Sequence, residues 1–215
     1  MTIHSPHAGL AAVTRRTVAV VLFDEVEVLD FAGPYEVFTT ATRVARRLDP
    51  AAADPFATFT FAETAAPFRA RAGLTALADH AFGAHPAIDL LIVPGGVVSA
   101  ELDKPAVIER IGTLAGQARI AAAVCTGAFL LGRAGLLDGL QATTHWEDIA
   151  DLRRDFPQAR IVADRRWIDE GRIVTSGGIS AGIDMSLHLV ERLAGRELAL
   201  RAARQMEYRW EEAIS

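Results

Sequence analysis

The sequence predicts one α/β domain with a mostly parallel sheet and helices on both faces. Short apolar runs alternate along the chain with longer helical segments, as in strand–helix–strand units. The length of 215 residues suits one domain, and no internal repeat or linker divides it. We expect residues 17–215 to form this domain. Residues 1–16 lack the continuous apolar core of a signal peptide, and we expect them to form a flexible N-terminal tail.

The composition excludes several classes of protein. Hydrophobic residues make up 51% and charged residues 23%, which is typical of a soluble globular chain with a sizeable core. The net charge of -5 argues against binding to a nucleic-acid backbone. No apolar run approaches the roughly 18 residues of a membrane span. The single cysteine excludes an intrachain disulfide framework and favours a reducing, cytoplasmic location.

The first part of the chain predicts two strands and a helix between them. Residues 17–23 form an apolar, β-branched run, which indicates a strand buried on both faces. A helix is expected over 35–48, with Pro34 in its first turn and Asp49-Pro50 closing it. The alternating residues 56–62 predict the second strand. Residues 68–77 indicate a weaker hairpin or edge pair.

The middle of the chain predicts two buried strands, each followed by a helix. Residues 89–93 form a strand that ends abruptly at Pro94-Gly95-Gly96, before a helix over 105–117. Residues 121–124 form the next strand. It runs directly into Cys125-Thr126-Gly127, where a helix over 128–134 begins at once and stops at Gly135.

The last third predicts a short strand, a helix, a hairpin and two further helices, over residues 142–144, 145–154, 166–175, 180–193 and 197–210. Thr144 and Glu147 have the spacing of a capping box for the first of these helices. Glu170-Gly171 is a hairpin turn signal. Ser180 is the expected N-cap of the long helix that follows.

Ligands of a parallel sheet collect at the carboxyl ends of its strands, so the residues that follow each strand are candidate site residues. In chain order they are Asp30, Gly95 and Gly96, Cys125 and Thr126, His145 and Trp146, and Gly177 and Gly178. They bring together a thiol, a carboxyl group, an imidazole and flexible glycines. No spacing of metal ligands and no phosphate-binding glycine fingerprint occurs, so neither a metal nor a nucleotide cofactor is expected.

Cys125 is the centre of this predicted site. A strand that turns into a helix within one residue places that residue on a sharp elbow, often strained. The free N–H groups and the macrodipole of the helix N-terminus favour an anion, so we expect a lowered thiol pKa and a nucleophilic cysteine. A lone cysteine is otherwise a small buried hydrophobic residue, and that is the competing interpretation.

The other candidates have roles around this thiol. Gly95 and Gly96, together with the N–H of Thr126, could form an anion-stabilising pocket, or simply a turn that ends a strand. Asp30, if protonated beside a thiolate, could donate a proton and later activate water, or it could only cap a helix. His145 is interpreted as a pocket residue more than as an essential base. A Cys–His–Glu relay through Glu147 is discounted because the capping box already explains that glutamate.

Six linked motifs resemble the ThiJ/PfpI superfamily. They are LDFAGP at 29–34, IVPGG at 92–96, AVCTGA at 123–128, GLLDG at 135–139, ATTHW at 142–146 and SGGISAGID at 176–184. The resemblance runs in order over nearly the whole chain. It implies a flavodoxin-like three-layer sandwich with a mostly parallel sheet, of the class I glutamine amidotransferase-like type, and usually a homodimer with its cysteine on a nucleophile elbow.

Within the superfamily, the isonitrile hydratase branch is the most similar, through Asp30, Cys125, Thr126 and His145. Two departures are Asp24-Glu25, where Pro-Gly is frequent, and Ser180 in place of threonine. The resemblance implies hydration of a small isonitrile to an N-substituted formamide without an external cofactor. Cys125 would attack the isonitrile carbon, Asp30 would supply a proton and then activate water, and Thr126 would orient the thiolate or the bound species.

Two other functions remain open at this point. One is a different cysteine enzyme of the superfamily, such as an amidase, a peptidase or a glyoxalase. The other is a non-enzymatic ligand sensor or stress protein whose cysteine is oxidised to the sulfinic acid. The same branch resembles the sensor domain of AraC-type regulators, which continue into a helix-turn-helix domain. Because the sequence stops at Ser215, we expect no such domain here.

Overall fold

The computed structural model describes residues 14–212. Its strands are β1 (Arg16–Leu22), β2 (Phe56–Ala62), β3 (Phe68–Arg69), β4 (Thr75–Ala76), β5 (His80–Ala81), β6 (Leu90–Val93), β7 (Ile120–Val124), β8 (Gln141–Ala142), β9 (Arg160–Ile161), β10 (Trp167–Asp169) and β11 (Ile173–Ser176). Its α-helices are α1 (Val28–Leu48), α2 (Ser99–Leu102), α3 (Pro105–Gln117), α4 (Gly127–Arg133), α5 (Ile149–Asp155), α6 (Ala181–Ala194) and α7 (Arg196–Gln205). Two short 3-10 helices are η1 (Arg71–Gly73) and η2 (Trp146–Asp148).

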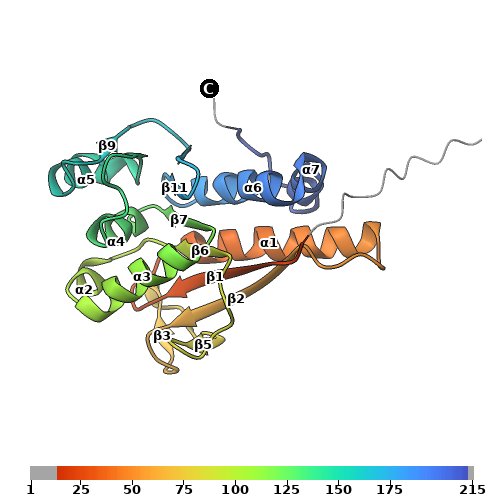
Figure 1. Ribbon diagram of the computed structural model, residues 1–215, viewed down its shortest axis with the longest axis horizontal. Coiled ribbons are helices and arrows are strands. Elements are labelled where there is room, and N and C mark those ends of the chain that lie inside the picture. Colours follow the sequence, from red (N-terminus) through yellow and green to blue (C-terminus); the bar gives the residue numbers. More distant parts are fainter. Residues whose placement is uncertain (1–13, 213–215) are drawn as a thin grey trace, which may run out of the picture.

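Seven strands form the central sheet, in the order β10-β11-β7-β6-β1-β2-β5. Every neighbouring pair is parallel except β10 and β11, which form the predicted antiparallel hairpin. Helices α1, α6 and α7 pack together on one face, and α2, α3 and α4 lie on the other (Figure 1). The predicted three-layer architecture with a mostly parallel sheet is therefore confirmed.

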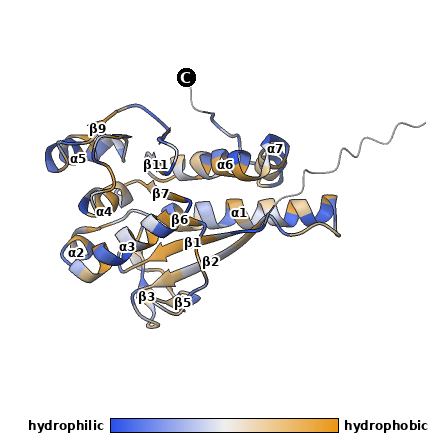
Figure 2. Cartoon of the chain, viewed as in Figure 1, coloured by the Kyte–Doolittle hydropathy of each residue, from blue (hydrophilic) through white to orange (hydrophobic). Residues whose placement is uncertain are grey.

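The two faces of the sheet bury separate apolar clusters. Successive side chains of a strand point to opposite faces, so a strand buried on both sides is apolar throughout. In β1, Val18 and Val20 pack toward α1, α6 and α7, whereas Ala19 and Val21 pack toward α3 and α4. The strands at the centre of the sheet are accordingly coloured as hydrophobic in Figure 2, while the helices also carry hydrophilic residues.

Helix α1 begins earlier than the sequence predicts. It starts at Val28 and not near Pro34, so Pro34 lies inside the helix and Asp30 lies in its first turn. The N–H of Asp30 already donates to the carbonyl of Glu27 at 3.2 Å, which closes a turn ahead of the proline. Proline has no N–H to donate, so it leaves the carbonyl of Asp30 without its usual helical partner. The consequence is that a rigid helix, and not a loop, positions Asp30.

The segment around residues 142–154 also differs from the prediction. Strand β8 pairs with β9 in a separate two-stranded sheet, so it does not end at the edge of the main sheet. The hydroxyl of Thr144 donates to the carbonyl of Cys125 at 2.8 Å, and no capping box forms. Glu147 is therefore free of the role that the sequence assigned to it. The segment opens as η2 and continues as α5.

Three smaller differences lie near the chain ends. Ser180 precedes α6 as predicted, but its hydroxyl makes no capping hydrogen bond. Helix α7 ends at Gln205 and not at residue 210, since Glu207 adopts a φ of 51° that no helix accommodates. The predicted N-terminal tail falls mostly outside the described residues, and Arg16 already pairs with Phe56 in β1. Among residues 14–212, no helix is both long and apolar enough to cross a membrane.

Candidate active site

Cys125 occupies the predicted elbow between β7 and α4. Its φ of 58° lies in the left-handed region, which is strained for a residue with a side chain. The N–H of Cys125 is held by the carbonyls of Ser176 at 3.2 Å and Gly177 at 3.3 Å. Helix α4 can start at once because residue 127 is glycine, where a Cβ would lie 2.2 Å from the carbonyl oxygen of Val93. The surrounding backbone thus fixes the thiol in place, and only 8% of the residue is exposed.

Asp30 supplies a buried carboxyl group beside this thiol. The residue is 0% exposed, and its Oδ1 accepts a hydrogen bond from the N–H of Ile179 at 2.9 Å. Its Oδ2 is buried without a hydrogen-bond partner of ordinary geometry. Burial raises the pKa of Asp30 from 3.8 to about 6, while the N–H of Ile179 and the thiol of Cys125 oppose the rise. The carboxyl group therefore titrates close to neutral pH.

The thiol pKa moves in the direction opposite to the sequence-based prediction. Burial and the adjacent charge of Asp30 raise the pKa of Cys125, and the N–H of Thr126 only partly offsets them. The N-terminus of a helix on its own would lower the pKa of the thiol. Here the nearby Asp30 carboxylate carries the same charge as a thiolate and therefore disfavours its formation. The sulfur and the carboxyl group therefore behave as a pair that holds one proton at neutral pH.

Hydrogen bonds and close backbone packing join Thr126 to the loop that contains Gly95 and Gly96. The hydroxyl of Thr126 donates to the carbonyl of Gly96 at 2.8 Å and accepts from the N–H of Gly96 at 2.9 Å. A Cβ at Gly95 would lie 2.6 Å from the Thr126 nitrogen and 2.9 Å from Asp30 Oδ2. The close backbone approach therefore requires glycine at residue 95. The N–H of Gly96 is thus already bonded to the hydroxyl of Thr126. The side chain of Thr126 holds the loop, and its backbone N–H interacts with the sulfur of Cys125.

His145 lies in the pocket, whereas its neighbour Trp146 lies on the surface. His145 lines the pocket in front of Cys125, and its Nδ1 lies 3.5 Å from Asp148 Oδ2 and 3.7 Å from Glu147 Oε2. Glu147 thus faces the imidazole and not Thr144. Trp146 is 75% exposed and does not line the pocket, contrary to the prediction.

Gly178 packs closely against the side chains of both His145 and Cys125. A Cβ at this residue would lie 2.3 Å from Cδ2 of His145 and 3.1 Å from the sulfur of Cys125. Glycine at 178 therefore lets the imidazole and the thiol approach the same strip of backbone. Gly178 does not itself line the pocket, so its predicted role there stays a prediction, but it packs against His145 and Cys125, which do line it.

We expect Gly178→Ala to destabilise the protein. The new methyl group would overlap the His145 ring, and such overpacking costs about 1–3 kcal/mol in the free energy of unfolding. Urea denaturation would measure it. Gly116→Ala in α3 is the matched control, since no atom lies within 4 Å of a Cβ there and alanine favours a helix. Equal stability of the two variants would contradict the packing argument.

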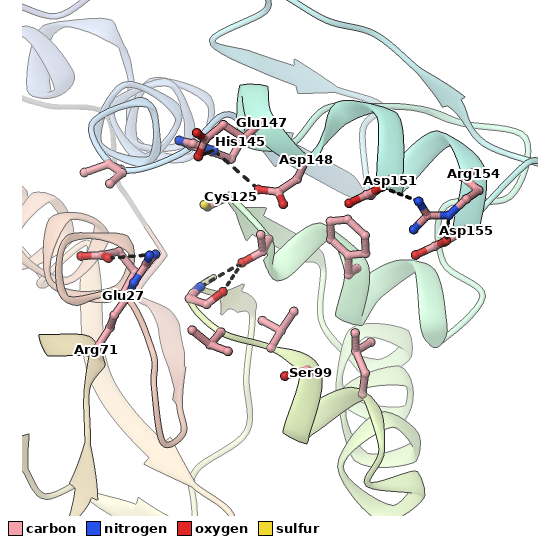
Figure 3. A pocket seen from close by; sticks show the side chains of 17 residues that line it. Glu27, Arg71, Ser99, Cys125, His145, Glu147, Asp148, Asp151, Arg154 and Asp155 are labelled. Atoms are coloured by element: carbon pink, nitrogen blue, oxygen red, sulfur yellow. Dashed lines mark hydrogen bonds and ion pairs between the residues drawn. The ribbon is translucent and has the colours of Figure 1, made fainter. Parts of the chain in front are cut away.

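The pocket in front of Cys125 has a volume of about 430 Å³ and two unlike walls (Figure 3). One wall is apolar and comes from the segment after β6, from α2 and from α4, with Val97, Val98, Leu102 and Phe129. The other comes from η2 and α5 and carries Glu147, Asp148, Asp151, Arg154 and Asp155. Glu27 and Arg71 close a third side. The pocket is large enough for a small organic molecule that reaches the sulfur.

Sequence reasoning missed two contributors to the site. Ile179 holds Asp30 through its backbone N–H, and its φ of 56° is an outlier for a β-branched residue. Because the contribution is from the backbone, the side-chain type carried no signal. The acidic face of α5 was also missed, since it is read from the sequence only as a solvated helix face. Among the described residues, no group of three or more His, Cys, Asp or Glu side chains is placed to hold a metal ion.

Comparisons with known proteins agree on one family. The sequence matches the DJ-1/PfpI family over residues 16–192. Isonitrile hydratase from Pseudomonas putida is 34% identical over 190 residues, which cover 87% of this chain and 76% of the hydratase. The HTH-type transcriptional regulator GbdR from Pseudomonas aeruginosa is 42% identical over 117 residues, which cover 53% of this chain and 31% of the regulator.

Solved structures support the fold. A ThiJ/PfpI family protein from Pseudomonas syringae superposes with a TM-score of 0.82 at 24% identity, covering 97% of this chain and 81% of its own. Drosophila melanogaster DJ-1beta superposes with a TM-score of 0.77 at 17% identity, covering 92% of this chain and 100% of its own. The class I glutamine amidotransferase-like fold predicted for the chain is thereby confirmed.

Proposed function

The chain belongs to the DJ-1/PfpI family, and from this premise we propose that it is an isonitrile hydratase-like enzyme. Such an enzyme adds water to an isonitrile and gives an N-substituted formamide. The observation that carries the proposal is the buried pair of Cys125 and Asp30, in which a carboxyl group with a pKa of about 6 lies against a thiol. The reaction needs a nucleophile and a group that both donates and accepts protons.

The first step adds the thiol to the terminal carbon of the isonitrile. The Asp30 carboxylate takes the proton of Cys125 as the sulfur bonds to that carbon, and the same proton then passes from Asp30 to the carbon. The product is a thioimidate, with a carbon–nitrogen double bond and a new carbon–hydrogen bond, attached to the sulfur. Asp30 ends this step as a carboxylate, so no net charge accumulates in the buried site.

The second step hydrates the thioimidate. The Asp30 carboxylate takes a proton from a water molecule as its oxygen bonds to the carbon, and the substrate nitrogen receives that proton. Collapse of the tetrahedral adduct forms the formamide carbonyl and breaks the carbon–sulfur bond. The proton of the adduct hydroxyl returns to the Cys125 and Asp30 pair. The N–H of Thr126 stabilises the departing thiolate, because it already lies at the sulfur.

The test is formamide production from simple alkyl and aryl isonitriles. We expect turnover with the native protein, detected by the formyl proton in NMR. In deuterium oxide the formyl carbon should carry deuterium, because its hydrogen passes through Asp30 from solvent-exchanged groups. No turnover across a panel of neutral, cationic and anionic isonitriles would contradict the proposal.

A second candidate is a cysteine hydrolase that uses His145 as its base. The contacts of His145 Nδ1 with Asp148 and Glu147 favour it, since a carboxylate can orient an imidazole next to a thiol. The two candidates differ in one comparison of variants. The hydrolase requires His145→Asn to lose far more activity than Asp30→Asn, whereas the hydratase requires the reverse order.

A further inference from the structure

The charges of the active-site pocket are unbalanced. Its lining contains five carboxylates and two guanidinium groups, from Glu27, Glu147, Asp148, Asp151, Asp155, Arg71 and Arg154. Each guanidinium group is already engaged. Arg154 bridges Asp151 at 2.5 Å and Asp155 at 2.9 Å, and Arg71 lies 3.9 Å from Glu27. The pocket therefore presents an excess of negative charge to whatever enters it.

Asp148 is a pocket carboxylate on which two neighbouring carboxylates act. Its ion-pair contact is with the imidazole of His145, at 3.5 Å, and the carboxylates of Asp151 and Glu147 act on it as like charges. Burial raises the pKa of Asp148, the imidazole of His145 partly offsets this rise, and the charges of Asp151 and Glu147 add to it. In Figure 3 its side chain points into the space between Cys125 and α5. A positive charge in that space would relieve the repulsion among the three carboxylates.

The rest of the pocket indicates a ligand that carries more than a charge. The same pocket is also lined by apolar side chains, among them Val97, Leu102 and Phe129. At the inner end lies the sulfur of Cys125, beside the fully buried carboxyl group of Asp30, whose Oδ2 has no hydrogen-bond partner of ordinary geometry. These features suit a molecule with an electrophilic end for the sulfur and an apolar body. Its far end would meet the carboxylates.

We propose that the pocket selects small electrophiles with an apolar body and a positively charged far end, such as an isonitrile that bears a quaternary ammonium group. The inference rests on the proposed hydratase function only for the identity of the electrophile. The charge selectivity follows from the pocket and is measurable without any turnover. The quaternary ammonium group would lie against Asp148 and Glu147 while its carbon chain contacts the apolar wall.

Charged thiol reagents test the selectivity directly. Cys125 is the only cysteine, so 2-(trimethylammonium)ethyl and 2-sulfonatoethyl methanethiosulfonate can label no other residue. The thiolate attacks the sulfenyl sulfur, a mixed disulfide forms and methanesulfinate leaves. Mass spectrometry gives the two rate constants. We expect the cation-to-anion ratio, divided by the ratio for a free small thiol, to be about tenfold or more at low salt.

Variants assign the effect to the acidic wall. Asp148→Asn together with Glu147→Gln should reduce the normalised ratio several-fold and weaken its dependence on salt. Asp138→Asn is the matched control, because Asp138 is exposed and does not line the pocket. It should leave the ratio unchanged. Asp30 is common to all these variants, so its charge cancels from the comparison.

A matched pair of substrates, one cationic and one neutral, tests whether the same charge selectivity appears in the reaction. The ethyl isonitrile that bears a trimethylammonium group should have a kcat/KM about tenfold higher than the isonitrile in which a tert-butyl group replaces it. A normalised reagent ratio near one, in native and variant proteins alike, overturns the inference whatever the turnover. A preserved ratio with no turnover of any isonitrile keeps the inference and removes the hydratase function.

Discussion

Cys125→Ala is expected to abolish formamide production, with a loss of at least about 10⁴-fold in kcat/KM. Without the sulfur, no thioimidate forms, and Asp30 has only water to activate next to a weakly electrophilic isonitrile. The fold should persist, because the substitution removes a single buried atom, and we expect the free energy of unfolding to change by about 1 kcal/mol or less. Formyl-proton NMR and urea denaturation measure the two quantities.

Cys125→Ser serves as the partner of this variant. Serine keeps a hydroxyl group of similar size that can donate to Asp30, yet it is a far weaker nucleophile than a thiol. We expect it to be as inactive as the alanine variant. Measurable turnover by either variant, in protein of native stability, would show that the reaction does not pass through a covalent sulfur adduct.

Asp30→Asn is expected to lower activity and raise stability together. The amide cannot carry the proton between the thiol and the substrate, so kcat/KM should fall by about 10²–10⁴-fold. The ionised carboxylate is costly in its buried position, as its pKa shift from 3.8 to about 6 shows. Removing that charge should increase the free energy of unfolding by about 2–3 kcal/mol at neutral pH. Asparagine can still accept the hydrogen bond from Ile179.

The stability gain of Asp30→Asn should depend on pH in a specified direction. The pKa of Asp30 is higher in the folded state than in the unfolded state, so the folded protein binds this proton more readily. The penalty is therefore absent below about pH 4 and fully present above about pH 6, so the advantage of the variant should grow across this interval. In the native enzyme, kcat/KM should fall below about pH 6 as Asp30 becomes neutral. A constant advantage at all pH values would contradict the burial argument.

Local sequence patterns were sufficient to predict the sheet and the elbow. A strand that becomes a helix within one residue is visible in the sequence, and Cys125 lies there with the expected strained φ. Asp30 was also identified, although the helix that carries it starts six residues before Pro34. Its place at the carboxyl end of β1 follows from the topology of a parallel sheet and not from the local helix boundary.

The errors arose where distant segments determine the outcome. The sequence could not show that β8 leaves the main sheet to pair with β9, and so it placed Trp146 in the pocket. Nor could it show that Thr144 donates to the carbonyl of Cys125, which frees Glu147 to face His145. The predicted direction of the pKa shift of Cys125 was wrong for the same reason. Its direction depends on how deeply Asp30 and the sulfur are buried together, which no local pattern encodes.

The strand order has a consequence for how the chain reaches its native state. Strand β7, which carries the thiol, pairs with β6 on one side and with β11 on the other, and the segment between β7 and β11 spans about a quarter of the chain. Closing such non-local parallel pairs makes folding slow compared with that of helical bundles. We expect the thiol of a refolding chain to stay open to oxidants until β11 pairs with β7. Its reactivity toward alkylating reagents should change in the slowest kinetic phase of refolding.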